Sequence, residues 1–304
     1  MNDIIKILEK EGPLTGKELY EKTGIDELRL WRYCYKANEI TVKTFGKKYL
    51  RLDKKIEGYA RLSPSIMREF LTYSVVGLNK DIAEIERKAE ILHENVKLIS
   101  KRKYELAYNT VSKIVDSLED SESIKTNICF MIAGDVVYDM AHSELRPEAS
   151  SGKLVRGSDL DIIVISRNLA DGFLRGLDLA IYKEKGFLIK NPQYMEEIDY
   201  VIKDISKAYE QMEFNDFKSM VASKILHEGI FLYGNREIFD DVKKCLWRKT
   251  FPKSCQSLKM KLLHTVRQLS NICLKMKMNS WKKSSQNISI QKKKAKKYFN
   301  CIHS

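Results

Sequence analysis

A short acidic stretch leading into a run of branched apolar residues constrains this chain most. The segment GSDLDIIVI spans residues 157–165. Branched residues favour a strand, and successive side chains of a strand alternate faces. Asp159 and Asp161 should therefore share one face, and Leu160, Ile162 and Val164 should lie on the other. Two carboxylates at the mouth of a buried strand are unfavourable unless a positive group lies between them. Mg²⁺, which binds carboxylate and phosphate oxygens, is the natural candidate.

The flanking segments supply a turn glycine and a third acid. Residues 128–133 (ICFMIA) predict a buried strand that ends at Gly134, and a short helix is expected over 136–143. Residues 196–202 (EEIDYVI) predict another strand, which carries Asp199 among apolar neighbours. A carboxylate from an adjacent strand would complete a site for two metal ions, which hold the attacking and leaving oxygens of an in-line displacement.

This order of elements resembles the DNA polymerase beta-like nucleotidyltransferase superfamily. Its pattern is a Gly-Ser or Gly-Gly turn after a strand, an acid-x-acid pair on the next strand and a later strand acid, which Gly134, Asp159, Asp161 and Asp199 match. The phrase HEGIFLYG (227–234) also resembles the end of small members, so the resemblance covers about residues 100–240. It implies that the three aspartates are catalytic and bind Mg²⁺ or Mn²⁺. The implied reaction moves a nucleoside monophosphate from an NTP to an acceptor hydroxyl.

The chain departs from this pattern after the turn glycine. Asp135 stands where the family has a hydroxyl or glycine, and its carboxylate would repel a triphosphate. The stretch from there to the acid pair is long, and it contains Ser150, Ser151, Lys153 and Arg156, which are residue types that bind phosphate. Gly134, with Ser158, Lys153 or Arg156, is expected to position the phosphates of the nucleotide. The alternative is that the acid pair only caps a turn or is solvated.

Residues 1–62 show a pattern of three helices followed by two strands. Helices are expected over 2–11, to Thr23, and from Asp26 to about Ala37, and the strands EITVKTF and KKYLRLD lie on either side of Gly46. This order resembles a winged helix-turn-helix domain. Thr15 and Glu18 have the spacing of a capping box before the second helix.

The third helix is the expected DNA-reading element. Leu28, Trp31 and Tyr35 are spaced for burial. The other face carries the predicted DNA-binding residues Arg29, Arg32, Tyr33 and Lys36, and Lys47 and Lys48 should lie near phosphates from the hairpin. Acidic neighbours dilute this charge, since residues 1–62 hold 14 basic and 10 acidic side chains. Protein contacts or dimerisation are the alternative use of such a domain.

Between these modules, residues 63–120 predict a helical linker. Asp81 to Leu118 is nearly free of helix breakers and should form one long helix, which offers a seam for a homodimer. Residues 121–241 then form the expected nucleotidyltransferase domain, a mixed β-sheet with flanking helices. The fold class predicted for the whole chain is α+β.

The positive charge of the chain lies in its C-terminal segment, residues 242–304. This segment has 17 Lys and Arg and no Asp or Glu, whereas residues 1–241 hold the other 37 basic side chains beside all 41 acidic ones. It also contains four of the six cysteines and two of the three tryptophans. A basic arm that follows nucleic-acid phosphates and an ending replaced by a shifted reading frame are both open interpretations.

Cysteine spacing and hydropathy bear on the compartment. The six cysteines show no C-x-x-C, which favours free thiols in a reducing cytoplasm, and no apolar run approaches the roughly 20 residues that span a bilayer. No membrane contact is therefore expected.

Three functions are compatible with the sequence. The leading hypothesis is an Mg²⁺-dependent nucleotidyltransferase with an NTP as substrate. The second is a DNA-binding regulator whose nucleotidyltransferase domain binds nucleotide without turnover. The third, an antitoxin-like protein that modifies or masks a partner protein, rests on resemblance to small superfamily members paired with toxins.

Overall fold

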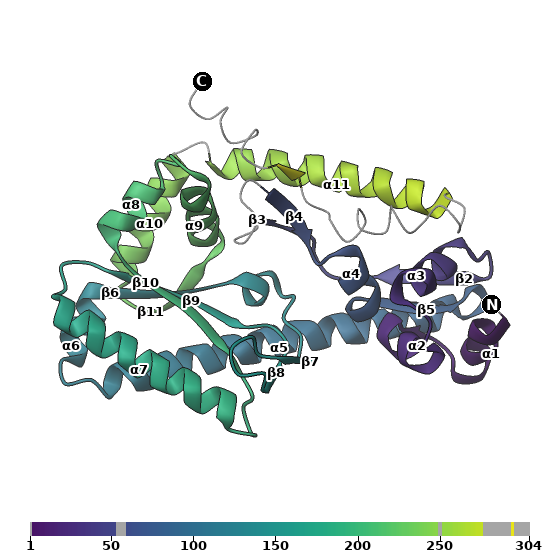
Figure 1. The fold of residues 1–304 in the computed structure, drawn as a ribbon, viewed down its shortest axis with the longest axis horizontal. Coiled ribbons are helices and arrows are strands. Elements are labelled where there is room, and N and C mark those ends of the chain that lie inside the picture. The colour runs from purple at the N-terminus through teal and green to yellow at the C-terminus, as the bar shows by residue number, and fades with distance from the viewer. Residues whose placement is uncertain (1, 53–58, 249–250, 276–292, 295–304) are drawn as a thin grey trace. The chain divides into compact units, whose positions relative to one another are not determined.

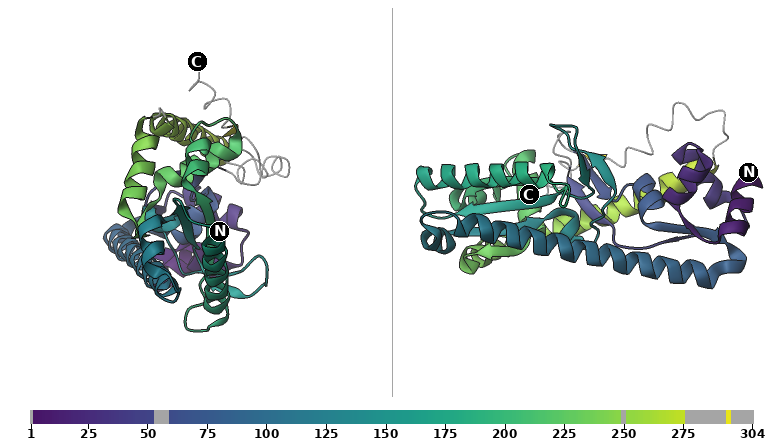
Figure 2. Two further views of the ribbon diagram at one scale, coloured as in Figure 1. Left: turned by 90° about the vertical axis from the view of Figure 1, so that its left-hand side faces the viewer. Right: turned by 90° about the horizontal axis from the view of Figure 1, so that it is seen from below.

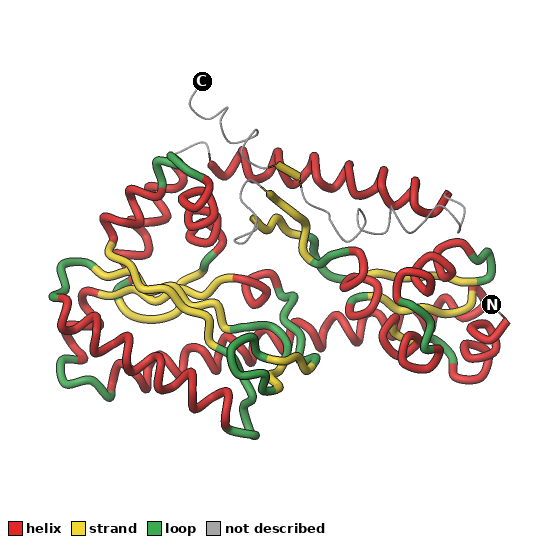
Figure 3. The backbone as a smooth tube through the Cα atoms, viewed as in Figure 1, coloured by secondary structure: helices red, strands yellow, loops and turns green. Residues whose placement is uncertain are grey.

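The computed structural model describes residues 2–52, 59–248, 251–275 and 293–294. It is a mixed α+β structure with several small sheets and one long helix (Figures 1 and 3). The chain divides into two compact units, residues 1–95 with 254–304 and residues 96–253. The helix α5 (Ile82–Asp116) contributes residues to both and runs without a break (Figure 2), which confirms the long helix expected over 81–118.

The first unit combines short helices with short strands. Its helices are α1 (Asn2–Glu11), α2 (Gly16–Thr23), α3 (Glu27–Lys36), α4 (Ile66–Thr72) and most of α11 (Phe251–Lys275). Its strands are β1 (Leu14–Thr15), β2 (Ile40–Thr44), β3 (Tyr49–Leu52), β4 (Tyr59–Ser63), β5 (Ser74–Leu78) and β12 (Lys293–Lys294). A short 3₁₀ turn, Asn79–Asp81, leads into α5.

The boundaries of α2 follow from its capping residues. The Thr15 hydroxyl accepts a hydrogen bond from the Glu18 backbone at 3.0 Å, and the Glu18 side chain accepts one from the Thr15 backbone at 2.6 Å, so the expected capping box is present. Gly24 ends the helix in the left-handed region, with φ at 59°.

The strand pairing of this unit corrects the expected hairpin. β2 does not pair with β3 but lies antiparallel to β5, with Thr44 opposite Ser74, and β3 pairs with β4. One three-stranded sheet has the order β1-β5-β2, while β3 and β4 belong to a second sheet with β12. The two strands expected as a wing thus belong to different sheets, and residues 45–73, which include β3 and β4, lie between β2 and its partner β5. The strand that completes the first sheet lies beyond residue 62.

The helix α11 has a regular buried stripe although it contains no acidic residue. Cys255, Leu258, Leu262 and Val266 are at most 7% exposed and recur every three or four residues. Met260, between them, is 61% exposed. Part of this segment is therefore a helix with one apolar face. The terminal KKKAKK cluster lies outside the described residues except for Lys293 and Lys294.

The second unit is a four-stranded sheet with helices on both faces (Figure 1). Its strands are β6 (Ile128–Ala133), β9 (Leu160–Ser166), β10 (Ile198–Asp204) and β11 (Ile230–Gly234), with a separate hairpin of β7 (Leu145–Pro147) and β8 (Leu154–Arg156). Its helices are α6 (Ser121–Asn127), the 3₁₀ turn η2 (Gly134–Tyr138), α7 (Asp171–Lys190), α8 (Ile205–Gln211), α9 (Phe217–Glu228) and α10 (Arg236–Arg248). The short helix expected over 136–143 is this turn, which ends at Tyr138.

The strand order is β10-β9-β6-β11, in which β10 is parallel to β9 and the other neighbours are antiparallel. One face packs on α5, α6 and α7 through Leu160, Ile162 and Val164 of β9. The other packs on α8, α9 and α10 through Ile163 and Ile165. The predicted alternation of β9 is confirmed, and Asp161 is in phase with the second face.

Among the helices that the structure describes, we find none with the length and apolarity needed to cross a membrane.

Candidate functional site

The strands β9 and β10 bring the predicted carboxylates together. Asp161 and Asp199 are register partners in the parallel pair, so their side chains leave the sheet on the same face, which is the face of Ile163 and Ile165. Asp159 lies two residues before Asp161, directly ahead of β9. Asp199 is exposed, whereas Asp159 and Asp161 are half-buried. The three acids therefore gather at the end of the sheet where β9 begins.

The turn after β6 lies directly against one of these carboxylates. Ala133 is the register partner of Asp161, and Gly134 follows with φ at 73°. A Cβ atom at Gly134 would lie 2.0 Å from Asp161 Oδ2. Only glycine combines this backbone angle with so close an approach to the carboxylate. The predicted turn glycine therefore belongs to the acidic site.

The glycine before the acid pair is constrained in a similar way. Gly157 has φ at 56°, and a Cβ atom there would lie 1.7 Å from the His142 carbonyl oxygen. Its backbone N–H donates to Glu144 O at 2.9 Å, and the next N–H, of Ser158, donates to His142 O at 3.1 Å. The approach to β9 is thus held by backbone contacts with residues 142–144.

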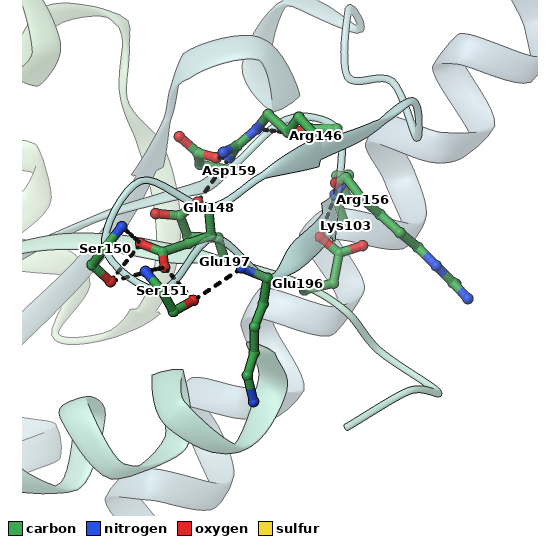
Figure 4. A network of polar contacts seen from close by, with 11 residues as sticks. Lys103, Arg146, Glu148, Ser150, Ser151, Arg156, Asp159, Glu196 and Glu197 are labelled. Atoms are coloured by element: carbon green, nitrogen blue, oxygen red, sulfur yellow. Dashed lines mark hydrogen bonds and ion pairs between the residues drawn. The ribbon is translucent and has the colours of Figure 1, made fainter. Parts of the chain in front are cut away.

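Arg146 is the cation of the acidic site, and the sequence did not indicate it. Its Nη2 forms ion pairs with Asp159 and with Glu197 Oε2, the latter at 2.9 Å, while Nε donates to Gly157 O at 2.7 Å (Figure 4). The pairing of β7 with β8 brings Arg146 to this position. Because the segment around it was expected to be an irregular loop, no periodicity selected Arg146 over Lys153 or Arg156.

The ion pairs around Arg146 are partly exposed to solvent. Its side chain is 32% exposed, similar to Asp159 at 33%, while Glu197 is 12% exposed. Such partly exposed pairs contribute about 1 kcal/mol or less each. Within the described residues, no three His, Cys, Asp or Glu side chains form a group arranged to hold a metal ion. The carboxylates that come nearest to such a set are Asp161 and Asp199 with Asp159, which is ion-paired to Arg146.

Ser158 is close to the acids, but its hydroxyl is engaged within the protein. Ser158 is 7% exposed, its hydroxyl donates to Asp135 Oδ2 at 2.7 Å, and it accepts from the His142 backbone at 3.3 Å. Asp135, expected to repel a triphosphate, is therefore one end of a partly buried link between the turn η2 and the start of β9. This link positions both segments, and Ser158 does not present its hydroxyl to the surface.

The loop between β7 and β8 encloses a carboxylate of its own. The Glu148 side chain accepts hydrogen bonds from both hydroxyls and both backbone N–H groups of Ser150 and Ser151, at 2.7–2.9 Å. The side-chain hydrogen bond from Ser151 and the backbone hydrogen bond from Ser150 are the main causes that lower the pKa of Glu148 to about 2. The two serines, which are phosphate-binding types, are therefore already occupied by this carboxylate.

The predicted phosphate ligands Lys153 and Arg156 are exposed on this hairpin. In Figure 4 the Arg156 side chain extends away from Asp159, and its backbone contributes instead. The Arg156 carbonyl accepts from Lys103 Nζ at 2.9 Å. Lys103 also forms a buried ion pair with Glu196. Burial lowers the pKa of Lys103 and raises that of Glu196, and the attraction between the two opposes both shifts.

A second buried cation, Lys224, lies next to the end of the turn η2 that begins at Gly134. Lys224 of α9 forms an ion pair with Glu228, and both groups contact the Tyr138 hydroxyl at the end of η2. Lys224 is 5% exposed, and its ammonium lies 5.7 Å from the centre of the Tyr138 ring, within the range of a cation–π contact. This cluster ties η2 to α9 and so fixes the turn that approaches Asp161.

The predicted DNA-binding residues of the first unit are only partly exposed. Arg29 and Lys36 are exposed on α3, but Arg32 is 6% exposed, so its place on an exposed face was wrong. Tyr33 is half-buried. Tyr35, expected to be buried, is 39% exposed, and the buried residues of α3 are instead Leu30, Trp31, Arg32 and Cys34.

The two lysines expected on the hairpin differ in their surroundings. Lys47 is exposed, and Lys48 forms an ion pair with Glu69 of α4 at 2.6 Å. Both line a small cavity of about 200 Å³ together with Arg267 of α11. The basic side chains of this unit are thus distributed over α3, the β2–β3 loop and α11.

Comparison with known proteins gives no family: neither the protein-family models nor the curated proteins contain a match to this chain.

Proposed function

We propose that the second unit is a divalent-metal-dependent nucleotidyltransferase. It transfers a nucleoside monophosphate from an NTP to an acceptor hydroxyl and releases pyrophosphate. The observation that carries the proposal is the register of Asp161 with Asp199 on parallel strands, with Asp159 two residues earlier and the Gly134 turn against Asp161. Carboxylates from two neighbouring strands can hold the metal ions that assist an in-line displacement.

The donor set fits a hard divalent cation. Asp159, Asp161 and Asp199 would hold Mg²⁺ or Mn²⁺ through carboxylate oxygens, the ligands these ions prefer. A Cβ atom at Gly134 would overlap Asp161 Oδ2, so the glycine keeps this carboxylate oxygen from being displaced by a side chain. When bound, the metal would neutralise phosphate charge and help the acceptor hydroxyl to lose its proton.

Arg146 replaces Ser158, Lys153 and Arg156 as the best-placed group for phosphate. Its guanidinium is held by Gly157 O and two carboxylates at the acidic end, and a planar guanidinium binds phosphate oxygens in a bidentate manner. In this proposal Asp159 turns from Arg146 to the metal, and Arg146 binds the triphosphate. A cytoplasmic location fits both the NTP substrate and the free thiols of the described cysteines Cys34, Cys129, Cys245 and Cys255.

Label transfer from the four α-labelled NTPs tests the proposal. The full chain is incubated with Mg²⁺ or Mn²⁺ and with RNA, protein and small-molecule fractions of a lysate as acceptors. The Asp161→Asn variant should lose at least about a hundredfold in rate, because several kcal/mol of charge stabilisation depend on the metal. Asp171→Asn, an exposed acid at the start of α7, is the matched control and should keep full activity.

Transfer that persists unchanged in Asp161→Asn would refute the mechanism. Absence of transfer with every NTP and acceptor would favour the second candidate, a DNA-binding regulator. Two observations support that candidate. The first is the ion pair of Arg146 with Asp159. The second is the exposed Arg29 and Lys36 on α3, which directly follows α2 and leads into the antiparallel pair of β2 with β5.

Fluorescence anisotropy with labelled duplex DNA tests this second candidate. The double variant Arg29→Gln/Lys36→Gln should bind more weakly than the unmodified chain and show a smaller dependence on salt, since each lost phosphate contact reduces the salt slope by about one. Lys10→Gln, in the last turn of α1, is the matched control. Equal binding by all three proteins would exclude α3 as the DNA-reading element.

A further inference from the structure

The strand β10 is an edge of the second unit's sheet, with a continuous ladder on one side. It pairs with β9 from Ile198 to Asp204, and no strand among the described residues pairs with its other side. Val201, in the middle, is 44% exposed. A long edge strand with an exposed apolar residue is a template for pairing with another strand.

Backbone groups of alternate β10 residues point to this outer edge. Leu160 N donates to Glu197 O at 2.8 Å, so the Glu197 carbonyl points toward β9. Successive residues of a strand direct their N–H and C=O groups to opposite edges. Ile198, Tyr200 and Ile202 therefore present theirs away from β9. An added antiparallel strand would bond to these residues and leave Val201 in a non-hydrogen-bonded pair.

The side chains of β10 are complementary to a second copy of themselves. In a two-fold antiparallel pair the axis must pass through a residue, since opposite residues share a face. An axis at Val201, the middle residue, lets the whole strand pair with its copy. Asp199 of each copy then lies opposite Lys203 of the other, so the contact occurs at two symmetric positions. Lys203 Nζ donates to Gln211 Oε1 at 2.9 Å, which orders its side chain on the face of Asp199. An axis at Asp199 or Lys203 would instead oppose like charges, which destabilises the pair.

A groove lies beside the same edge, on the face of the sheet opposite Asp199, and it leaves room for side chains of a second copy. It has a volume of about 570 Å³, and its lining includes Tyr200, Val201 and Ile202 together with the charged residues Asp171, Arg175 and Asp178. Tyr200 is fixed there, since its hydroxyl donates to Asp178 Oδ1 at 2.8 Å. The Val201 axis puts Tyr200 opposite Ile202 on this face. The groove's charges have both signs, so two copies related by a two-fold axis can match them.

We infer that this chain forms a symmetric homodimer in which β10 pairs antiparallel with β10 of a second copy about Val201, joining two sheets into one. The inference does not rest on nucleotidyl transfer. It uses a surface other than the α5 seam. Because Lys203 of the second copy and a divalent cation would compete for Asp199, the oligomeric state is measured with a chelator present.

A cysteine at the two-fold axis tests the arrangement in the full chain. The Cβ atoms of an opposite non-hydrogen-bonded pair lie about 4.5–5.5 Å apart, close to the range that a disulfide bridges. Val201→Cys should give a covalent dimer under mild oxidation, and peptide mass spectrometry should identify a disulfide that joins position 201 of the two copies. Ile230→Cys, on the opposite edge strand β11 and 41% exposed, is the matched control and should give no such self-link.

A charge exchange provides the second measurement, by sedimentation over a dilution series. Asp199→Lys should weaken the dimer about tenfold or more, because it opposes like charges at two symmetric positions. Adding Lys203→Asp to the same chain should restore the dimer. A chain that is monomeric throughout the series would overturn the inference. A dimer that shows neither the disulfide in Val201→Cys nor the response to charge exchange would overturn it too.

Discussion

At the scale of the residue, one guanidinium balances the acidic end of β9. Arg146 forms ion pairs with Asp159 and Glu197 and donates to Gly157 O, so it holds the start of the strand through charge and backbone together. Asp159 is also one of the carboxylates that a divalent cation would need. The Asp159 carboxylate can therefore bind either Arg146 or a divalent cation, and the two compete for it.

Arg146→Gln should raise the affinity of the chain for Mn²⁺. The variant loses the ion pairs to Asp159 and Glu197, which should lower the free energy of unfolding by about 1 kcal/mol without metal. The freed carboxylates should then bind Mn²⁺ more tightly, as measured by titration calorimetry. Arg156→Gln, on the neighbouring strand, is the control. Equal Mn²⁺ affinity in both variants would contradict a shared site for Arg146 and the metal.

His227, at the end of α9, gives the stability of this unit a pH dependence. Burial, with smaller contributions from Lys243 and Lys224, lowers the pKa of His227 to about 4. Between this value and the unfolded pKa of about 6.5, the unfolded chain binds a proton that the folded chain does not. The contribution of His227 is therefore complete above pH of about 6.5 and decreases as the pH falls toward the folded pKa.

His227→Asn should remove this dependence. Urea unfolding is measured over a series from about pH 7 to about pH 4.5. In the unmodified chain, His227 should lower the free energy of unfolding by about 1–2 kcal/mol across this range. This value allows for solvent screening, because the group is half-buried. The variant should show a correspondingly shallower decrease. His264→Asn, exposed on α11, should leave the profile unchanged. A profile that is identical in all three proteins would assign the pH dependence to other groups.

At the scale of the element, the turn after β6 depends on a glycine whose neighbour is a carboxylate. The sequence predicted this glycine because it followed a buried apolar run, and it predicted the alternation of β9 because the apolar residues had period two. It did not predict Arg146 or the buried state of Arg32. α3 has apolar or aromatic residues at 28, 30, 31, 33, 34 and 35, so more than one stripe could have been buried. Packing selected Leu30, Trp31 and Cys34.

Gly134→Ala should destabilise the second unit more than Gly152→Ala. Both glycines have positive φ, 73° and 68°, so each substitution should cost about 1 kcal/mol from backbone strain. Only at Gly134 would the added Cβ meet a neighbour, Asp161 Oδ2, while at Gly152 there is nothing within 4 Å. The difference in unfolding free energy, measured in urea, isolates this contact. Equal losses would show that the turn can move away from Asp161.

At the scale of the whole molecule, the sequence determined local elements better than their partners. The long helix α5 and the capping box were predicted because their signals lie within a few residues. The pairing of β2 with β5 was not, because the two strands are separated by residues 45–73 and either neighbour satisfied the apolar pattern of β2. The acid-free C-terminal segment could not be interpreted from composition, but the buried stripe of α11 requires a partner surface.

Leu262→Ala should distinguish a packed α11 from an unselected ending. Leu262 is 2% exposed, and truncating a buried leucine lowers the free energy of unfolding by about 2–5 kcal/mol. Met260→Ala, 61% exposed on the same helix, should change it by less than about 0.5 kcal/mol. Urea unfolding of both variants checks the prediction. Equal, small effects would mean that α11 contributes nothing to the folded unit.

The pairing of β5 with both β1 and β2 also fixes an order of events during synthesis. The two strands that leave the ribosome first, β1 and β2, do not pair with each other. Within the part of the chain that the structure describes, each pairs with β5 alone. Helices α1, α2 and α3 depend on local hydrogen bonds and can form earlier. Translation must therefore pass Leu78 before any strand of this sheet has a neighbour.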